Sequence, residues 1–295
     1  KTLLAILLWT TASAAAAQDP GSAIAIGDRR ELLVDDFLVE KISGEARRQL
    51  HQPVPQEVVL TTDAPWEGNA CGYPSVFQDG KLYRMYYHAG HYRHGGKPAE
   101  AGPVHPWFLC YVESDDGIHW RRPELGLFEF EGSKKNNIIL TPDCVAAIKG
   151  DPAHTAVFKD ANPDCPADAR YKCIIVGKPH GLYVLKSADG IRFSVATEKP
   201  VITDGAFDSQ NLFFWDPLRN EYRAYWRIFT AGVADGTAWK PEGFRAIRTA
   251  TSKDGLSFSN QADLRYVDSP TAHLYVNQIL PYYRAPHIFM GFPMR

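Results

Sequence analysis

The chain has 295 residues, of which 45% are hydrophobic, 22% charged and 12% aromatic, the balance of a globular protein with one large domain or two small ones. The net charge of -2 at pH 7 provides no strong basic field, which argues against nucleic acid and anionic membranes as partners. The 23 glycines and 21 prolines interrupt aromatic and β-branched runs at short intervals, which favours an all-β protein.

Residues 1–17 have the pattern of a secretory signal peptide. Lys1 precedes an apolar run from Leu3 to Trp9, and small residues follow as far as Ala17. The run is far shorter than the roughly 20 apolar residues of a membrane span. We therefore predict an exported protein, secreted or periplasmic, with no membrane span once the signal peptide is cleaved.

The next strand-like segment is Glu31–Glu40, "ELLVDDFLVE". Alternation along a strand would place Asp35 and Asp36 on opposite faces. A carboxylate on an inward face needs a partner, because unpaired burial is costly. We interpret the two aspartates as structural and expect this segment to complete the last unit of a repeated fold.

A strand, a turn and a second strand recur along the chain. The first copy turns through Asp79-Gly80, and Asp-Gly is a strong signal for a hairpin. A fourth copy begins near the end of the sequence. The four copies lie at Pro74–Gly90, Thr155–Lys178, Asn211–Phe229 and His273–Pro293.

A second motif, serine, any residue, Asp-Gly, two residues and an aromatic, occurs three times. The copies are "SDDGIHW" from Ser114, "SADGIRF" from Ser187 and "SKDGLSF" from Ser252. Each follows a strand-like run, so we predict that each connects the third and fourth strands of a small antiparallel sheet. The aromatic residue should then pack beneath the next strand.

The two motifs alternate in a fixed order, and the glycines of the second lie 73 and 65 residues apart. Four-stranded units of this size that repeat along a chain are typical of β-propeller blades. A β-sandwich with accidental Asp-Gly turns would not explain the order. We predict a β-propeller domain over 18–295, with three full blades and part of a fourth. The chain ends inside an apolar run, so we expect the C-terminal part of the fold to be missing.

Five cysteines leave at least one unpaired unless it bonds outside the chain. None forms a CxxC pair, which argues against a thiolate zinc site. Cys165 and Cys173 flank a short excursion, and both a bridge between them and free thiols are consistent with the sequence.

The wording "YPSVFQDGKLYRMYY", followed by "SDDGIHWRRP", resembles the five-bladed propellers of glycoside hydrolase families 43 and 32. "ELLVDDFLVE" and "FDSQNLFFWDP" are similar to an uncharacterised exported bacterial branch of that superfamily. The resemblance implies a five-bladed propeller with three carboxylates in a pocket at one end of its channel. It implies no organic cofactor, and it allows a structural calcium ion to which we assign no ligands.

Two of the three carboxylate positions implied by this resemblance are not acidic here. Tyr73 stands at the first, with Glu67 the nearest replacement, and His154 stands near the second, with Asp151 three residues earlier. Asp208 matches the third. We therefore name Asp208, Glu67 and Asp151 as candidate catalytic residues, because glycoside cleavage uses one carboxyl group as acid and another as base or nucleophile.

Candidate sugar-binding residues surround these positions. Polar side chains at the start of an inner strand can reach ligand hydroxyls, aromatic faces stack on sugar rings, and an arginine can bind an acidic group. His88, His91 and His94 have neither strand nor helix spacing, so we name no metal site, and both a solvated loop and a loop that lines the pocket are consistent with the sequence. The candidates are Tyr73, His154, Trp66, Gln210, Asn211, Arg227 and His88.

The leading hypothesis is an exported glycosidase that cleaves oligo- or polysaccharides by carboxylate acid/base catalysis, with a carbohydrate as its partner. One alternative is a carbohydrate-binding propeller without turnover, which Tyr73 and His154 at carboxylate positions would suit. Another is a structural or interaction module of the cell envelope. Because propeller folds serve many functions, the fold alone does not separate these alternatives.

Overall fold

A computed structural model of the chain describes residues 23–93, 102–266 and 269–294. The chain divides into two units, 1–53 and 54–295. The signal-peptide prediction at 1–17 falls outside the described residues. Within the described part, no helix is long and apolar enough to cross a membrane.

The first unit contains no helix or strand between residues 23 and 53. The sequence prediction of a strand at 31–40 is therefore wrong. This segment forms bends and turns, and most of its side chains are exposed. The backbone N–H of Phe37 donates to Asp35 Oδ1 at 3.0 Å, and Arg48 forms an ion pair with Asp36. Short acidic side chains that bond the local backbone in this way compete with strand pairing.

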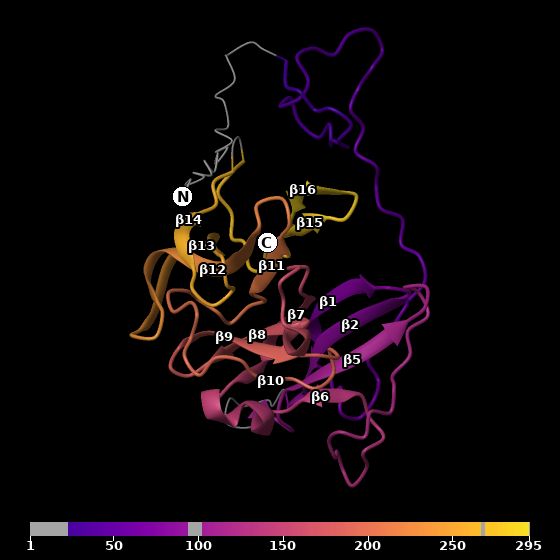
Figure 1. Cartoon of the computed structure of the whole chain (residues 1–295), viewed down its shortest axis with the longest axis vertical. Helices are drawn as coiled ribbons and strands as arrows, with labels where there is room; N and C mark the ends of the chain where they lie inside the picture. Colours follow the sequence, from indigo (N-terminus) through magenta and orange to yellow (C-terminus); the bar gives the residue numbers. More distant parts are fainter. Residues whose placement is uncertain (1–22, 94–101, 267–268, 295) are drawn as a thin grey trace, which may run out of the picture. The chain divides into compact units, whose positions relative to one another are not determined.

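The second unit is all-β, and its described residues include three four-stranded antiparallel sheets (Figure 1). In the first sheet the strand order is β1-β2-β5-β6, and a two-stranded ribbon, β3-β4, lies between β2 and β5 in sequence. The bounds are β1 Gly72–Asp79, β2 Leu82–Ala89, β3 Tyr92–Arg93, β4 Gly102–Pro103, β5 Phe108–Ser114 and β6 Ile138–Leu140.

The second and third sheets repeat this arrangement, with orders β10-β9-β8-β7 and β11-β12-β13-β14. The bounds are β7 Asp151–Lys159, β8 Tyr171–Gly177, β9 Gly181–Ser187, β10 Ser194–Val195, β11 Leu212–Asp216, β12 Glu221–Ala234, β13 Trp239–Ser252 and β14 Ser259–Asp263. Short 3₁₀ segments, Pro142–Ile148 and Ala167–Ala169, lie before β7 and before β8.

The fourth strand-turn-strand copy forms a two-stranded sheet, β15 Leu280–Tyr282 with β16 Ala285–Met290. The sequence prediction of repeated four-stranded antiparallel units in an all-β protein is thus confirmed for three units.

The Ser-x-Asp-Gly segments connect the third and fourth strands in all three sheets, as predicted. In the first, Ser114 Oγ donates to Asp116 Oδ1 at 2.9 Å and accepts from the N–H of Gly117 at 2.9 Å. The N–H groups of Ile118 and His119 also donate to Asp116 Oδ1, each at 2.8 Å. The same bonds recur in the turns that start at 187 and 252.

The glycine of each turn has a positive φ of 73° to 79°, which side chains rarely adopt. The aromatic residue of each turn packs against a buried cluster, as expected. The motif therefore recurs because each turn needs the same serine, aspartate and glycine to satisfy its own backbone.

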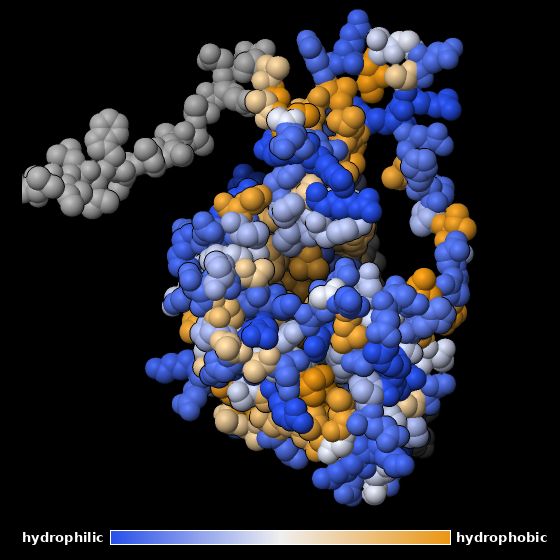
Figure 2. Space-filling model, turned by 45° about the vertical axis from the view of Figure 1, so that its right-hand side comes forward, coloured by the Kyte–Doolittle hydropathy of each residue, from blue (hydrophilic) through white to orange (hydrophobic). Residues whose placement is uncertain are grey.

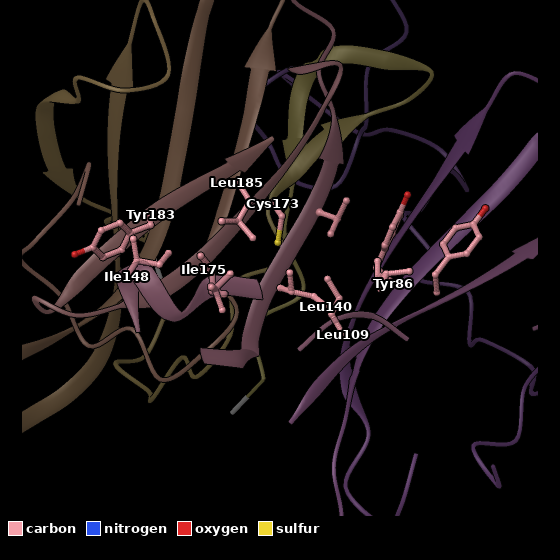
Figure 3. Packing of buried hydrophobic residues seen from close by; sticks show 12 residues of the cluster. Tyr86, Leu109, Leu140, Ile148, Cys173, Ile175, Tyr183 and Leu185 are labelled. Carbon is pink, nitrogen blue, oxygen red and sulfur yellow. The ribbon is translucent and has the colours of Figure 1, made fainter. Parts of the chain in front are cut away.

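The second and third sheets bury both faces against neighbouring sheets, whereas the first sheet buries one face against the second sheet and the other against connecting segments around Trp66 and Phe128. Figure 3 shows the cluster between the first two sheets, where Tyr86, Leu109 and Leu140 lie toward Cys173 and Leu185. A second cluster joins the other face of the second sheet to the third, and a further cluster joins the third sheet to β16. Alternate residues of β8 point into different clusters, which is the period-2 pattern of a strand buried on both faces.

The five cysteines all lie in the described residues, and none forms a disulfide. Cys173 is fully buried between the first two sheets, and Cys165 is partly buried. Burial raises the pKa of Cys173 above its ordinary value, as expected for a buried thiol that packs as a small apolar residue.

Candidate functional site

The first strands of the sheets, β1, β7 and β11, line a cavity of about 1000 Å³ together with β15 and β16. Its walls are mainly apolar, and Gln78, Gln210 and Gln278 are among the polar residues that face it. Figure 2 shows a hollow on one face of the molecule with hydrophobic residues on its floor. Of the ten predicted site residues, Gln210 lines this cavity.

Two of the first strands are bulged near their start. The register of β1 with β2 shifts between Gly72 and Ser75, and that of β7 with β8 shifts between Asp151 and Thr155. Within the first bulge Tyr73 has a φ of 49°, the left-handed region that is strained for a side chain. Bulges and strained residues of this kind re-aim side chains and concentrate at functional sites.

The second bulge places Asp151 and His154 in contact. His154 Nδ1 lies 2.7 Å from Asp151 Oδ2, and the two side chains are 22% and 42% exposed. Burial acts to raise the pKa of Asp151, but the hydrogen bond and charge of His154 outweigh it and lower the pKa. Asp151 is therefore held as a carboxylate, and it orients the imidazole so that Nε2 is left to meet a ligand.

His88, near the end of β2, lies beside this pair. Its Nδ1 donates to the carbonyl oxygen of Ala153 at 2.6 Å, and its ring makes an edge contact with Tyr73 at a centroid distance of 4.9 Å. Trp107 contacts its ring at 5.0 Å. Burial lowers the pKa of His88, so the ring is neutral and Nε2 is an acceptor.

Arg227 lies in β12 of the third sheet, and Asp208 lies in the segment just before β11. Arg227 is 1% exposed, and its guanidinium donates to Asp208 Oδ1 and, at 3.1 Å, to the carbonyl oxygen of Ala206. Burial lowers the pKa of Arg227. Asp208 keeps half of its side chain exposed, so its carboxylate is anchored to a buried cation and still reaches solvent.

Tyr275 links the third sheet to the first. Its hydroxyl donates to the carbonyl oxygen of Asp208 at 3.1 Å, and the hydroxyl of Tyr73 donates to it at the same distance. The ring of Tyr73 also lies 5.9 Å from that of His154. Tyr73 therefore connects residues of three sheets, and burial raises the pKa of its hydroxyl, which keeps it protonated.

Gln210 and Asn211 hold the backbone rather than reach outward. The amide of Gln210 donates to the carbonyl oxygens of Tyr73 and Pro74 at 3.0 and 3.2 Å, which ties β11 to β1. Asn211 donates to the carbonyl oxygens of Phe207 and Ser209. Among the described residues, the buried Ser209 Oγ and Asn211 Oδ1 have no hydrogen-bond partner.

The structure does not bring Glu67 and Trp66 to this cluster. Glu67 is fully buried; Arg122 donates to both of its oxygens at 2.9 and 2.8 Å, and Tyr87 donates to Oε1. Trp66 Nε1 donates to Asn137 Oδ1 at 2.6 Å, and its ring packs on the face of the first sheet opposite His88. These contacts are structural, and a catalytic role for Glu67 stays a prediction.

Sequence reasoning assigned no role to two members of the cluster, Tyr275 and Trp107. Tyr275 precedes the fourth strand pair, and Trp107 lies just before β5, so neither has a motif that marks it. His91 lies 6.2 Å from His105 by ring centroids, and His94 falls outside the described residues. Among the residues that the structure describes, no three metal-binding side chains form a group.

The arrangement can bind a polyhydroxylated ligand. Seven of the ten predicted residues lie in one connected cluster drawn from three sheets: Tyr73, His88, Asp151, His154, Asp208, Gln210 and Arg227. It offers two partly exposed carboxylates as acceptors, an oriented imidazole and a tyrosine hydroxyl. Such convergent polar groups beside a mainly apolar cavity are typical of small-molecule sites.

The sequence matches no protein-family model and no curated protein. Among solved structures, it is similar to a glycosyl hydrolase from Bacteroides ovatus, with 15% identity over 65% of this chain and 51% of that chain and a TM-score of 0.39. An N-acetylgalactosamine deacetylase from F. plautii, in complex with blood group B trisaccharide, has 15% identity over 73% of this chain and 60% of that chain, at a TM-score of 0.43.

A β-1,2-mannobiose phosphorylase from Listeria innocua has 12% identity over 65% of this chain and 57% of that chain, at a TM-score of 0.36. This chain spans between 51% and 60% of the length of these three structures. The chain is distantly similar in structure to glycoside-hydrolase-like proteins, and its family is unassigned.

Proposed function

We propose that the protein is an exported carbohydrate-active enzyme that cleaves glycosidic bonds in oligo- or polysaccharides. One observation carries the proposal: the starts of the first strands of the second and third sheets place two partly exposed carboxylates, Asp151 and Asp208, in one connected cluster, and Gln210 of that cluster lines the cavity. Glycoside cleavage needs a base or nucleophile and a proton donor on either side of a sugar.

Asp208 is the better candidate for base or nucleophile. Its ion pair with Arg227 stabilises the charged form of a carboxylate, which is the form that either role requires. The proton donor would be His154. Its Nδ1 faces the carboxylate of Asp151, which a lowered pKa keeps ionised, so Nε2 is the nitrogen that would pass a proton to the substrate.

We further infer that the sheets are blades of a five-bladed propeller. The sheets pack face to face in chain order, and the first strand of each lies at the cavity. Residues 1–17 support export by their sequence. A structural calcium ion in the channel is not part of the proposal, because we assign it no ligands.

A carbohydrate-binding protein without turnover is the second candidate. Asp151 contacts His154, and Asp208 contacts Arg227. A carboxyl group acts as a proton donor when apolar surroundings favour its neutral form, and neither carboxylate has such surroundings. This observation favours the second candidate. A structural module of the cell envelope has no observation in its favour.

The test is incubation of the full chain with a broad panel of oligosaccharides, with products identified by mass spectrometry. Asp208→Asn should abolish product formation, whereas Asp164→Asn, which changes an exposed aspartate in the β7–β8 connection, should not. Products that persist in Asp208→Asn would support enzymatic activity and contradict a catalytic role for Asp208. Binding without any product would favour the second candidate.

A further inference from the structure

Arg245 in β13 differs from the arginines near it. Arg223 and Arg248, in the same sheet, each form ion pairs with two carboxylates. The side chain of Arg245 makes no ion pair or hydrogen bond with any residue that the structure describes, and its buried Nε has no partner. It is half-buried, so water solvates it only in part.

A second guanidinium lies beside it. Arg245 and Arg227 lie over the same two aromatic rings, those of Phe229 and Tyr275. The guanidinium carbon of Arg245 lies 5.5 Å from the centroid of Phe229 and 5.7 Å from that of Tyr275. For Arg227 the corresponding distances are 5.5 and 4.9 Å. Asp208 is the carboxylate that pairs with Arg227. Two cations and one described anion leave a net positive charge in a partly desolvated place, which is costly without a further partner.

The charge of Arg245 also acts to lower the pKa of Arg227, in the same direction as burial, which is the dominant cause. The two arginines therefore destabilise each other in the unliganded protein. A bound oxyanion would relieve this repulsion, and guanidinium groups bind carboxylates and sulfates through two parallel hydrogen bonds.

An exposed aromatic ring lies in the same hairpin as the arginine pair. Strands β12 and β13 have 14 residues each, whereas β11 and β14 have five, so their hairpin extends beyond the sheet. Trp239, in this extension, is 54% exposed and lies 6.2 Å from Phe229 by ring centroids. Such rings stack on the apolar faces of sugars, so the anion that fits here is one carried by a sugar.

We propose that Arg245, with Arg227, binds an oxyanion substituent of the saccharide, the carboxylate of a uronic acid or a sulfate ester, while Trp239 stacks on the sugar that carries it. This inference rests on the proposed carbohydrate function and names its substrate class. Arg227 and Tyr275 connect the anion subsite to Asp208, so the acidic sugar lies next to the reacting carboxylate.

The test is isothermal titration of the full chain with matched pairs of saccharides. Oligogalacturonides and glucuronoxylo-oligosaccharides are compared with their methyl-esterified or carboxyl-reduced forms, and sulfated oligosaccharides with their desulfated forms. Mass spectrometry after each titration separates binding from cleavage. At least one acidic member should bind about 10- to 100-fold more tightly than its neutral counterpart, as expected for hydrogen bonds between charged groups.

Three variants locate the effect. Arg245→Gln should remove the preference, and Arg245→Lys should keep part of it, because the charge stays but the paired geometry is lost. Lys240→Gln, which removes an exposed cation from the same hairpin, should leave the preference unchanged. Circular dichroism checks the fold of each variant, and the acid-against-neutral comparison in the wild type does not depend on any of them.

Each outcome bears on one proposal or on both. Equal binding or cleavage of acidic and neutral forms would overturn the anion subsite and keep the carbohydrate function. Tighter binding of acidic saccharides without any cleavage would support the anion subsite and contradict the proposed glycosidase activity. Binding of inorganic phosphate, lost in Arg245→Gln, with no acidic saccharide bound would overturn the inference, as would a preference that survives in Arg245→Gln. No binding of any saccharide would overturn both proposals.

Discussion

The two ends of the four-stranded sheets are built differently. At one end of β2, Tyr83 lies opposite Ser114 of the Ser-x-Asp-Gly turn, whereas His88, near the other end, lies opposite Gly72 beside the candidate site. The turn end repeats one set of hydrogen bonds three times. The site end has no repeated motif among its described residues, and it holds bulged strands, a strained tyrosine and buried polar atoms without partners.

The two ends differ in where their residues find hydrogen-bond partners: nearby in the sequence at the turn end, and in other sheets at the site end. Residues that satisfy each other within a few positions stabilise a sheet wherever they occur, so the same motif can recur. Residues whose partners come from other sheets are specific to one place, and their unsatisfied groups are a cost to stability that a ligand can offset. Substitutions at the turn end should therefore affect stability, and substitutions at the site end should affect activity.

The largest expected contrast is between two histidines that each contact an aspartate three residues earlier. His154 Nδ1 lies 2.7 Å from Asp151, and His119 Nδ1 lies 2.6 Å from Asp116 in a turn. His154→Gln should lower turnover by about 10²- to 10⁴-fold, the usual loss for a group that transfers protons. His119→Gln should leave turnover unchanged. Equal effects of the two substitutions on initial rates would argue against the proposed role of His154.

Two turn glycines should show graded losses of stability. Gly190→Ala would place a Cβ 2.7 Å from Tyr86 Oη and 3.0 Å from Arg84 Nη1, at a φ of 77°. Gly117→Ala has a similar φ of 79°, but its nearest neighbour lies at 3.6 Å. Gly117→Ala should lower the free energy of unfolding by about 1–2 kcal/mol, the cost of the left-handed conformation.

Gly190→Ala should lower the free energy of unfolding further, because the buried Tyr86 and Arg84 must also move. Urea unfolding at a fixed pH measures both changes. If Gly117→Ala proved the more destabilising of the two, the contacts at Gly190 would not be those described. Turnover per folded molecule should be the same for both variants.

Two serines provide a smaller contrast. Ser187→Ala, at the turn end, removes the hydroxyl that donates to Asp189 and accepts from the N–H of Gly190, and it should cost about 1–2 kcal/mol of unfolding free energy. Ser209→Ala, at the site end, removes a buried hydroxyl without a described partner. It should be neutral or slightly stabilising in thermal unfolding. A clear loss for Ser209→Ala would mean that its hydroxyl has a partner.

The smallest effect concerns pH. Although burial acts to raise it, hydrogen bonds from the N–H groups of Arg192 and Ile191 lower the pKa of Asp189 to about 2. An ordinary aspartate in the unfolded chain titrates near pH ~3.9. The stabilisation by ionised Asp189 is therefore fully present above about pH 4 and is lost as the pH falls toward 2.

Urea midpoints of the wild type and Asp189→Asn should accordingly differ at pH 6. The difference should shrink between about pH 4 and pH 2, because protonation removes the advantage of the carboxylate. A gap that stays constant over this range would show that Asp189 contributes through its shape rather than its charge.

The sequence predicted the turn end well because its interactions are local. The serine, aspartate and glycine of each turn lie within four positions and form hydrogen bonds with each other or with the adjacent backbone. The strand connections that start at 114, 187 and 252 could therefore be predicted from the pattern. The strand expected at 31–40 failed for a related reason. Its two aspartates bond a local backbone N–H and Arg48, which the apolar residues around them do not reveal.

The site end could be predicted only in part. Asp208, Asp151 and His154 stand at the starts of predicted inner strands, and strand order brings them together. Glu67 was placed by nearness in sequence, but its partner Arg122 lies 55 residues away, on the face of β2 opposite His88. No pattern foretells the bulge at Tyr73 or the contact with Tyr275, 202 residues along the chain, because both arise from packing between sheets.

The Ser-x-Asp-Gly turn also affects how the protein ages. An aspartyl-glycyl bond slowly rearranges to isoaspartate when the glycine nitrogen attacks the preceding carboxyl carbon. In this fold the glycine N–H is donated to the serine hydroxyl, and the aspartate oxygen is held by two backbone N–H groups. While these hydrogen bonds are intact, the glycine nitrogen and the aspartate carboxyl group are held in positions that disfavour the attack. Isoaspartate at Asp116, Asp189 or Asp254 would therefore record how long each turn has been open.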